Sequence, residues 1–134
     1  MATKSILLID DEASVRELVE ACLNDLAGWD VETVASAQEG LRWLDAKHPD
    51  VILLDVLMPG MDAITFLHKL REIPSCQSLP VILLTVRARW FTSQKLQEMG
   101  VVEAIAKPFN PVTLPDTIAN VLGWDSQIED ESIR

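Results

Sequence analysis

Short apolar runs and longer amphipathic segments alternate along the chain. A continuous run of branched apolar residues, bounded by polar or turn residues, is typical of a strand buried on both faces of a parallel sheet. The run Val51-Ile52-Leu53-Leu54 is the clearest case, because it leads directly into Asp55 and then into a Pro-Gly turn. Such runs, with one alternating segment that indicates a half-exposed edge strand at 31–34, predict five strands: residues 5–9, 31–34, 51–55, 81–84 and 101–105.

The segments between these strands have the residue spacing of helices with one apolar side. The first predicted helix begins at a capping box, Ser14-x-x-Glu17, and ends at Gly28. Its expected apolar stripe consists of Val15, Leu18, Val19, Cys22, Leu23 and Leu26.

Capping residues mark the later helices as well. Ser36-x-x-Glu39 is a second capping box, Asp62 starts a third helix, and Gly100 ends a fourth over residues 92–99. The third helix is expected to turn three residues towards the core: Ile64, Leu67 and Leu70.

The last helix reaches Leu122 and has two possible starts. Asn110 followed by Pro111 forms a suitable cap, since proline favours the first helical position. Pro115 would then remove a backbone donor inside the helix, so a start nearer Leu114 is the alternative.

Five strands that alternate with five helices predict an α/β fold with a parallel sheet and right-handed crossovers. At 134 residues the chain has the length of one domain. We expect this domain to cover residues 1–123 and residues 124–134 to form an acidic, flexible tail.

Composition narrows the function classes. The net charge of −10 argues against binding to nucleic acid, which requires Lys and Arg to neutralise phosphates. It fits a protein that binds a metal ion or a cationic partner. The two cysteines lack metal or redox spacing, and no apolar stretch is long enough to cross a membrane. We therefore expect a cytoplasmic protein with free thiols and no membrane insertion.

Polar side chains follow four of the predicted strands where each one ends. These are Asp10 and Asp11, Asp55, Thr85, and Lys107. The carboxyl ends of parallel strands share one edge of the sheet, so we expect these side chains to converge. Clustered carboxylates repel one another, and Mg²⁺ relieves that repulsion because it binds carboxylates, waters and phosphate oxygens together. Such a site is equipped for phosphoryl transfer onto an aspartate.

The ordered motifs resemble the receiver domain of two-component response regulators. The resemblance covers about residues 4–123 and rests on four stretches: Ile6-Leu7-Leu8-Ile9-Asp10-Asp11-Glu12, Leu53-Leu54-Asp55-Val56-Leu57-Met58-Pro59-Gly60-Met61-Asp62, Leu83-Leu84-Thr85 and Lys107-Pro108-Phe109. It implies a flavodoxin-like sheet of order 2-1-3-4-5. It also implies phosphorylation by a histidine kinase or a histidine phosphotransfer protein.

The resemblance implies a role for each matching residue. Asp55 is the expected phosphoacceptor, Lys107 pairs with the acceptor and the phosphoryl group, and Thr85 is the switch hydroxyl. The expected Mg²⁺ ligands, which would also accept Mn²⁺, are Asp11, Asp55 and the backbone carbonyl of Leu57, with Asp10 acting largely through water.

Three positions depart from the family pattern. Ala104 stands where the family usually has a switch Tyr or Phe, and we hypothesise that Trp90 carries part of that signal instead. Val86 replaces a small residue, and it flanks the phosphorylation site with Leu57 and Arg87. We expect this crowding to slow autodephosphorylation. The other tryptophans are expected to pack, with Trp124 anchoring the last helix.

Two alternative functions are left open by the sequence. One is a pseudo-receiver that binds partners without being phosphorylated, which Ala104 allows. The other is a Mg²⁺-dependent phosphatase with an Asp nucleophile, which would need a general acid at position 57. In the leading interpretation the protein is not an enzyme apart from self-catalysed phosphotransfer and slow autodephosphorylation. Output is expected through a protein partner or a homodimer, on the face formed by the fourth helix, fifth strand and fifth helix.

Overall fold

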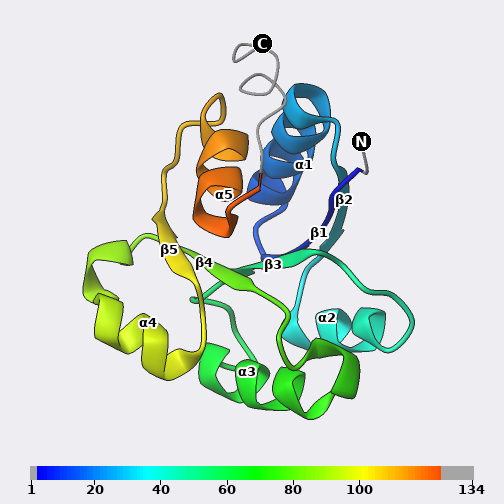
Figure 1. The fold of residues 1–134 in the computed structure, drawn as a ribbon, viewed down its shortest axis with the longest axis vertical. Helices are drawn as coiled ribbons and strands as arrows, with labels where there is room; N and C mark the ends of the chain where they lie inside the picture. Colours follow the sequence, from blue (N-terminus) through cyan, green and yellow to red (C-terminus); the bar gives the residue numbers. More distant parts are fainter. Residues whose placement is uncertain (1–2, 125–134) are drawn as a thin grey trace.

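The computed structural model describes residues 3–124, which form a central parallel sheet between two helical layers (Figure 1). The five strands are β1 (Ser5–Ile9), β2 (Asp30–Val34), β3 (Val51–Asp55), β4 (Val81–Thr85) and β5 (Glu103–Ala106). The helices are α1 (Ala13–Ala27), α2 (Ala37–Leu44), α3 (Ala63–Glu72), α4 (Ser93–Met99) and α5 (Leu114–Leu122), with short 3-10 turns η1 (Pro74–Cys76) and η2 (Ala88–Trp90). The strand order is β2-β1-β3-β4-β5, so the predicted flavodoxin-like topology is confirmed.

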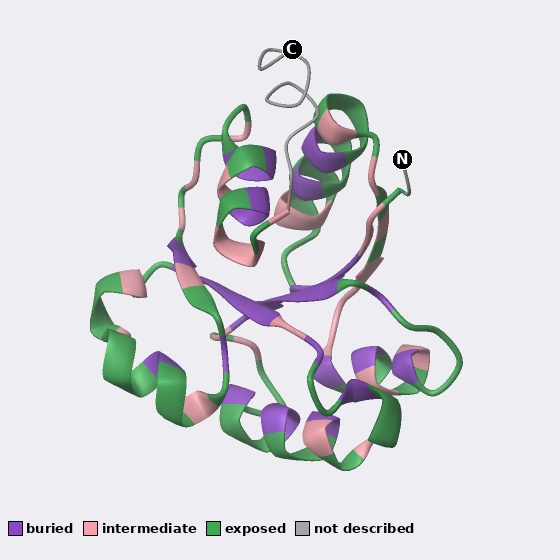
Figure 2. Cartoon of the chain, in the orientation of Figure 1, coloured by how far each residue is buried: buried purple, intermediate pink, exposed green. Residues whose placement is uncertain are grey.

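The sheet separates two apolar cores (Figure 2). α1 and α5 cover one face, and α2, α3 and α4 cover the other. Alternate residues of the central strands point to opposite faces, and β3 and β4 are buried along their whole length. Strand β2 pairs only with β1 and is partly exposed, as its alternating sequence predicts.

Most of the predicted helix ends are confirmed. Ser36 Oγ accepts a hydrogen bond from the backbone N–H of Glu39 at 3.1 Å, and Asp62 accepts one from Thr65 at 2.7 Å. Gly100 ends α4 with a φ of 72°, a left-handed conformation that glycine adopts without strain.

The predicted capping box at Ser14 is wrong. Helix α1 begins at Ala13 after Glu12, which makes no side-chain cap, so Ser14 already lies in the first turn. The turn is instead held by Asp10, whose carboxylate accepts a hydrogen bond from the backbone N–H of Glu12 at 2.9 Å. The apolar stripe of this helix is also narrower than predicted, because Leu18 and Leu26 are exposed.

The inward face of α3 differs from the prediction at one position. Ile64 is 50 % exposed, whereas Phe66, which the prediction omitted, is fully buried together with Leu67 and Leu70. The helix begins at Ala63, and this start directs residues 63, 66, 67 and 70 towards the sheet.

The structure defines where the last strand and the last helix begin. Strand β5 begins at Glu103 and not at residue 101, because the Val101 N–H bonds back to Leu96 at the end of α4. Helix α5 begins at Leu114 with Pro115 in its first turn, which confirms the later start. Asn110 caps a separate turn by accepting the Val112 N–H at 2.9 Å.

The end of α5 packs against residues from the amino-terminal part of the chain. The rings of Trp124 and Trp29 meet edge to face at 5.2 Å, and the Lys4 ammonium lies 4.7 Å above the Trp124 ring. The predicted anchoring role of Trp124 is therefore confirmed. The predicted acidic tail from Asp125 lies outside the described residues. Within residues 3–124, no helix combines the length and hydropathy that crossing a membrane requires.

Candidate active site at the carboxyl edge of the sheet

Three polar residues are buried in the described part of the chain, and all three lie at the carboxyl edge of the sheet. Asp10 follows β1 and is 0 % exposed, Asp55 ends β3 at 4 %, and Thr85 ends β4 at 1 %. Their strands are hydrogen-bonded neighbours in the order β1-β3-β4. The convergence predicted from the sequence is confirmed.

Asp11 completes a carboxylate cluster. One oxygen atom from each of Asp10, Asp11 and Asp55 lies within 4.8 Å of the others. The pKa of Asp55 is raised above its usual value, first by burial and then by the negative charge of Asp10. Hard carboxylate oxygens held this closely, with Asp11 exposed to solvent, suit a divalent cation such as Mg²⁺, which keeps some of its waters.

Lys107 brings the positive charge to this cluster. Its Nζ lies 2.8 Å from Asp10 Oδ2, 3.2 Å from Glu12 Oε1 and 3.5 Å from Asp55 Oδ1. Burial opposes the charged ammonium, but the hydrogen bond and charge of Asp10, with Asp55 and Glu12, outweigh it and raise the Lys107 pKa. Every ion pair that the structure shows within residues 3–124 involves this lysine.

Further hydrogen bonds hold Asp55 and Asp10 in place. Asp55 Oδ1 accepts a hydrogen bond from the Leu57 N–H at 3.2 Å. The guanidinium of Arg16, one turn into α1, donates to the Asp10 carbonyl at 2.8 Å. Sequence reasoning missed both Arg16 and the Glu12–Lys107 contact. The only sequence feature that pointed to Glu12 and Arg16 was their position shortly after Asp10 and Asp11.

Thr85 connects the site to the following loop. Its hydroxyl oxygen accepts a hydrogen bond from the backbone N–H of Arg87 at 3.0 Å, and its carbonyl accepts the Lys107 N–H at 2.9 Å. The strand end thus holds the lysine in place and positions the start of η2.

A solvent-accessible cleft of about 300 Å³ opens onto the cluster. It is lined by Asp11, Glu12, Asp55, Leu57, Val86 and Lys107. Leu57 and Val86 are 53 % and 62 % exposed, so the mouth of the cleft has two apolar walls.

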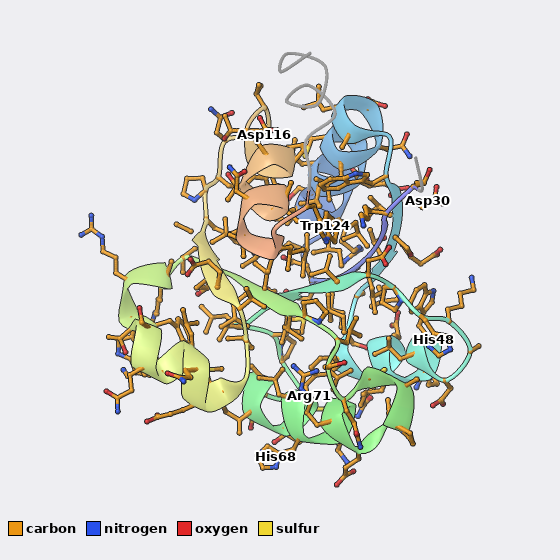
Figure 3. All side chains as sticks on the ribbon, viewed as in Figure 1. Asp30, His48, His68, Arg71, Asp116 and Trp124 are labelled. Atoms are coloured by element: carbon orange, nitrogen blue, oxygen red, sulfur yellow. The ribbon has the colours of Figure 1, made fainter. Side chains whose placement is uncertain are left out.

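No histidine belongs to this site, although a histidine is a common phosphate carrier. Both histidines of the chain are labelled in Figure 3. His68 points away from the sheet on α3, and His48 lies in the α2–β3 loop beside Trp43 and Lys47. Asp55 is the buried carboxylate that lines the cleft.

Comparisons with known proteins agree with this geometry. Residues 6–119 match the family described as "Response regulator receiver domain". The chain is 40 % identical over 120 residues to "Response regulator Rre1" of Synechocystis, covering 88 % of this chain and 51 % of that protein. It thus spans about half the length of several curated relatives.

Solved structures show the same fold. The Vibrio cholerae chemotaxis response regulator CheY4 superposes with a TM-score of 0.81 at 33 % identity, covering 90 % of this chain and 99 % of that one. The receiver domain of the Pseudomonas aeruginosa sensor histidine kinase PA1611, solved with a magnesium ion coordinated in its active-site cleft, superposes with a TM-score of 0.78 at 27 % identity, covering 91 % and 99 %. This chain belongs to the family of response regulator receiver domains.

Proposed function

We propose that the domain stores a signal as a phosphoryl group on Asp55, delivered by a histidine kinase or a histidine phosphotransfer protein. The observation that carries this proposal is the contact of Lys107 with the buried carboxylates of Asp10 and Asp55, beside the buried Thr85 and under a cleft that Asp55 and Lys107 line. This arrangement has a nucleophile, a cation and a hydroxyl at one point, and phosphoryl transfer depends mainly on such positioning.

In the transfer, an Asp55 carboxylate oxygen attacks the phosphorus atom. The phosphorus–nitrogen bond of the donor histidine breaks, its electron pair returns to the imidazole, and a phosphorus–oxygen bond forms to Asp55. The Leu57 N–H holds Oδ1 in place, which orients the carboxylate for this attack. The Lys107 ammonium, already 3.5 Å from Asp55, is placed to neutralise charge on the transferred group.

The residues present fit a divalent cation. Asp10, Asp11, Asp55 and the backbone carbonyl of Leu57 would hold Mg²⁺, or Mn²⁺ in its place, with Asp10 acting largely through water. When bound, the ion supplies positive charge to the phosphoryl oxygens.

Transfer of the signal would begin at Thr85. Its hydroxyl oxygen holds the Arg87 N–H, and the Arg87 carbonyl in turn accepts the Trp90 N–H at 2.9 Å. If Thr85 turns towards a phosphoryl group, the first of these bonds breaks and η2 is released. Phe91, which directly follows η2, and Ala104 of β5 both pack against the apolar core on the α2–α3–α4 side of the sheet.

The relay is testable in a variant that keeps only Trp90, with Phe at positions 29, 43 and 124. Binding of beryllium fluoride, a phosphoryl mimic, with Mg²⁺ should change the fluorescence of Trp90. Unchanged intensity and wavelength would contradict the relay without affecting the phosphorylation proposal. Output would then proceed through the face formed by α4, β5 and α5, to a partner or a second copy.

The phosphorylation itself is tested by intact mass. Wild-type protein incubated with Mg²⁺ and a small acyl phosphate should gain one phosphoryl group, and Asp55→Asn should gain none. Asp45→Asn is the matched control, because it removes an exposed carboxylate on the end of α2. A wild-type protein that gains nothing would contradict the proposal and favour the pseudo-receiver alternative. A phosphatase would turn the group over quickly, but position 57 is an apolar leucine and offers no general acid.

A further inference from the structure

The segment from residue 73 to residue 97 differs in charge from the rest of the chain. It contains no Asp or Glu, although the chain has 21 of them and a net charge of −10. It contains three basic residues, which are Arg87, Arg89 and Lys95. They lie in and around η2 and the first turns of α4, at the end of the molecule where β4 leaves the sheet (Figure 1).

These three cations are available to a partner. All three side chains are exposed, and within residues 3–124 every ion pair found involves Lys107 and none of them. The exposed cations therefore concentrate positive charge in one part of a strongly negative molecule.

An aromatic ring lies among the cations. Trp90 is 64 % exposed, whereas Trp29, Trp43 and Trp124 are only partly exposed. The Lys95 ammonium lies 4.1 Å from the centre of the Trp90 ring and donates to the Trp90 carbonyl at 3.2 Å. Phe91 meets the same ring edge to face at 5.5 Å. The ring is thus held in place with one surface open, as in residues that anchor protein partners.

We infer that Arg87, Arg89, Trp90 and Lys95 form a binding surface for an acidic segment of a partner protein. We call this set the basic aromatic surface. Carboxylates of the segment would pair with the cations, and one apolar side chain would cover the Trp90 ring. Three cations on a chain of net charge −10 are too few to hold a nucleic acid, which favours an acidic peptide as the occupant.

The surface is coupled by geometry to the phosphorylation site. The Thr85 hydroxyl holds the Arg87 N–H, and the Arg87 carbonyl holds the Trp90 N–H. Regulation of binding by phosphate rests on the proposed function, whereas the binding itself does not. Partner binding would respond to Asp55 because the same two hydrogen bonds set the position of Trp90.

The test uses the four tryptophan indole N–H signals in a ¹⁵N–¹H NMR spectrum of the full chain. The Trp90 signal is assigned by its loss in Trp90→Phe. The probe is a short Glu-rich peptide with one central Leu, and its Gln-for-Glu version is the neutral control. The Glu-rich peptide should shift the Trp90 signal at concentrations where the signals of Trp29, Trp43 and Trp124 do not move.

Charge-reversal variants distinguish binding at the basic aromatic surface from a general effect of the net charge on peptide binding. Arg89→Glu should weaken binding of the Glu-rich peptide by about tenfold. Arg42→Glu changes the net charge equally on the exposed side of α2, and it should leave binding within about twofold. Raised salt should weaken binding of wild-type protein.

Three results would overturn the inference. They are a shift of all four indoles together, an equal loss of binding in Arg42→Glu and Arg89→Glu, and tighter binding of a single-stranded oligonucleotide than of the Glu-rich peptide. Normal phosphorylation by intact mass together with any of these results rejects the surface alone. Peptide binding without any phosphorylation rejects the proposed function alone.

Discussion

Removing the charge of Asp55 should stabilise the metal-free protein. Asp55→Asn keeps the shape of the side chain and an oxygen that can accept the Leu57 N–H. It removes a charge from a residue that is only 4 % exposed. Because burial is the main cause of the raised Asp55 pKa, the charged carboxylate is destabilising in the folded state.

The size of the effect follows from the distances. With an effective dielectric constant of about 20, repulsion from Asp10, which has an oxygen within 4.8 Å, costs at least about 3 kcal/mol, and attraction to Lys107 at 3.5 Å contributes about 5 kcal/mol. Weaker repulsion from the exposed Asp11 brings these opposing effects close to cancellation. The main remaining contribution is the cost of removing the charged Asp55 carboxylate from water. Because Asp55→Asn removes this cost, we expect it to raise the free energy of unfolding by about 1–2 kcal/mol. For a domain of this length that is a rise in Tm of roughly 3–8 °C.

The pH dependence of the stability difference between Asp55→Asn and wild type is a second test of the direction of this effect. A carboxyl group whose folded-state pKa is raised destabilises the protein above that pKa, and the penalty disappears as the pH falls to the unfolded-state pKa. The advantage of Asp55→Asn should therefore be larger at about pH 7 than at about pH 4. Thermal unfolding in EDTA, followed by circular dichroism at both values, measures it. Asp45→Asn should show no gain at about pH 7. Our account of the site would be refuted by a variant less stable than wild type at about pH 7, or by a gain that persists undiminished in acid.

Three further predictions test other parts of the structure. Val86→Ala should widen the mouth of the cleft to water and shorten the phosphoryl half-life roughly fivefold, corresponding to about 1 kcal/mol of barrier; an unchanged or longer half-life by intact mass would contradict the crowding argument. Mg²⁺ at ten times its Kd should stabilise wild type by about 1.4 kcal/mol in urea unfolding, and Asp11→Asn should need more Mg²⁺ for the same gain. Phe66→Ala should lower the free energy of unfolding by about 3–5 kcal/mol, because it empties a buried site. Ile64→Ala on the same helix should change it by less than about 0.5 kcal/mol, and equal effects of the two substitutions would contradict the packing of α3.

The positions of the central strands and the location of the site were both predictable from the apolar pattern, and for the same reason, whereas the order of the strands was implied only by the resemblance to receiver domains. In a parallel sheet every central strand is buried on both faces, so it appears as an unbroken apolar run. The first polar residue after such a run marks the carboxyl edge. Asp10, Asp55 and Thr85 all follow runs of this kind, and all three are found together.

The details that could not be predicted depend on which side of a helix faces the sheet and on the conformations of long side chains. A one-residue uncertainty in the start of α3 decides whether Ile64 or Phe66 faces the sheet, and both residues are apolar. The contact between Glu12 and Lys107 joins residues 95 positions apart, and it depends on the conformations of two long side chains. Local patterns contain neither kind of information.

The central claim is that Asp55 accepts the phosphoryl group, and localising that group tests it most directly. Wild-type protein is phosphorylated with Mg²⁺ and a small acyl phosphate, then reduced with borohydride, which converts a phosphorylated aspartate into homoserine. Tandem mass spectrometry of the digest should find homoserine at position 55 and unmodified aspartate at positions 10 and 11. Homoserine at position 10 or 11 with none at position 55, or a phosphoryl group on His48 or His68, would contradict the account.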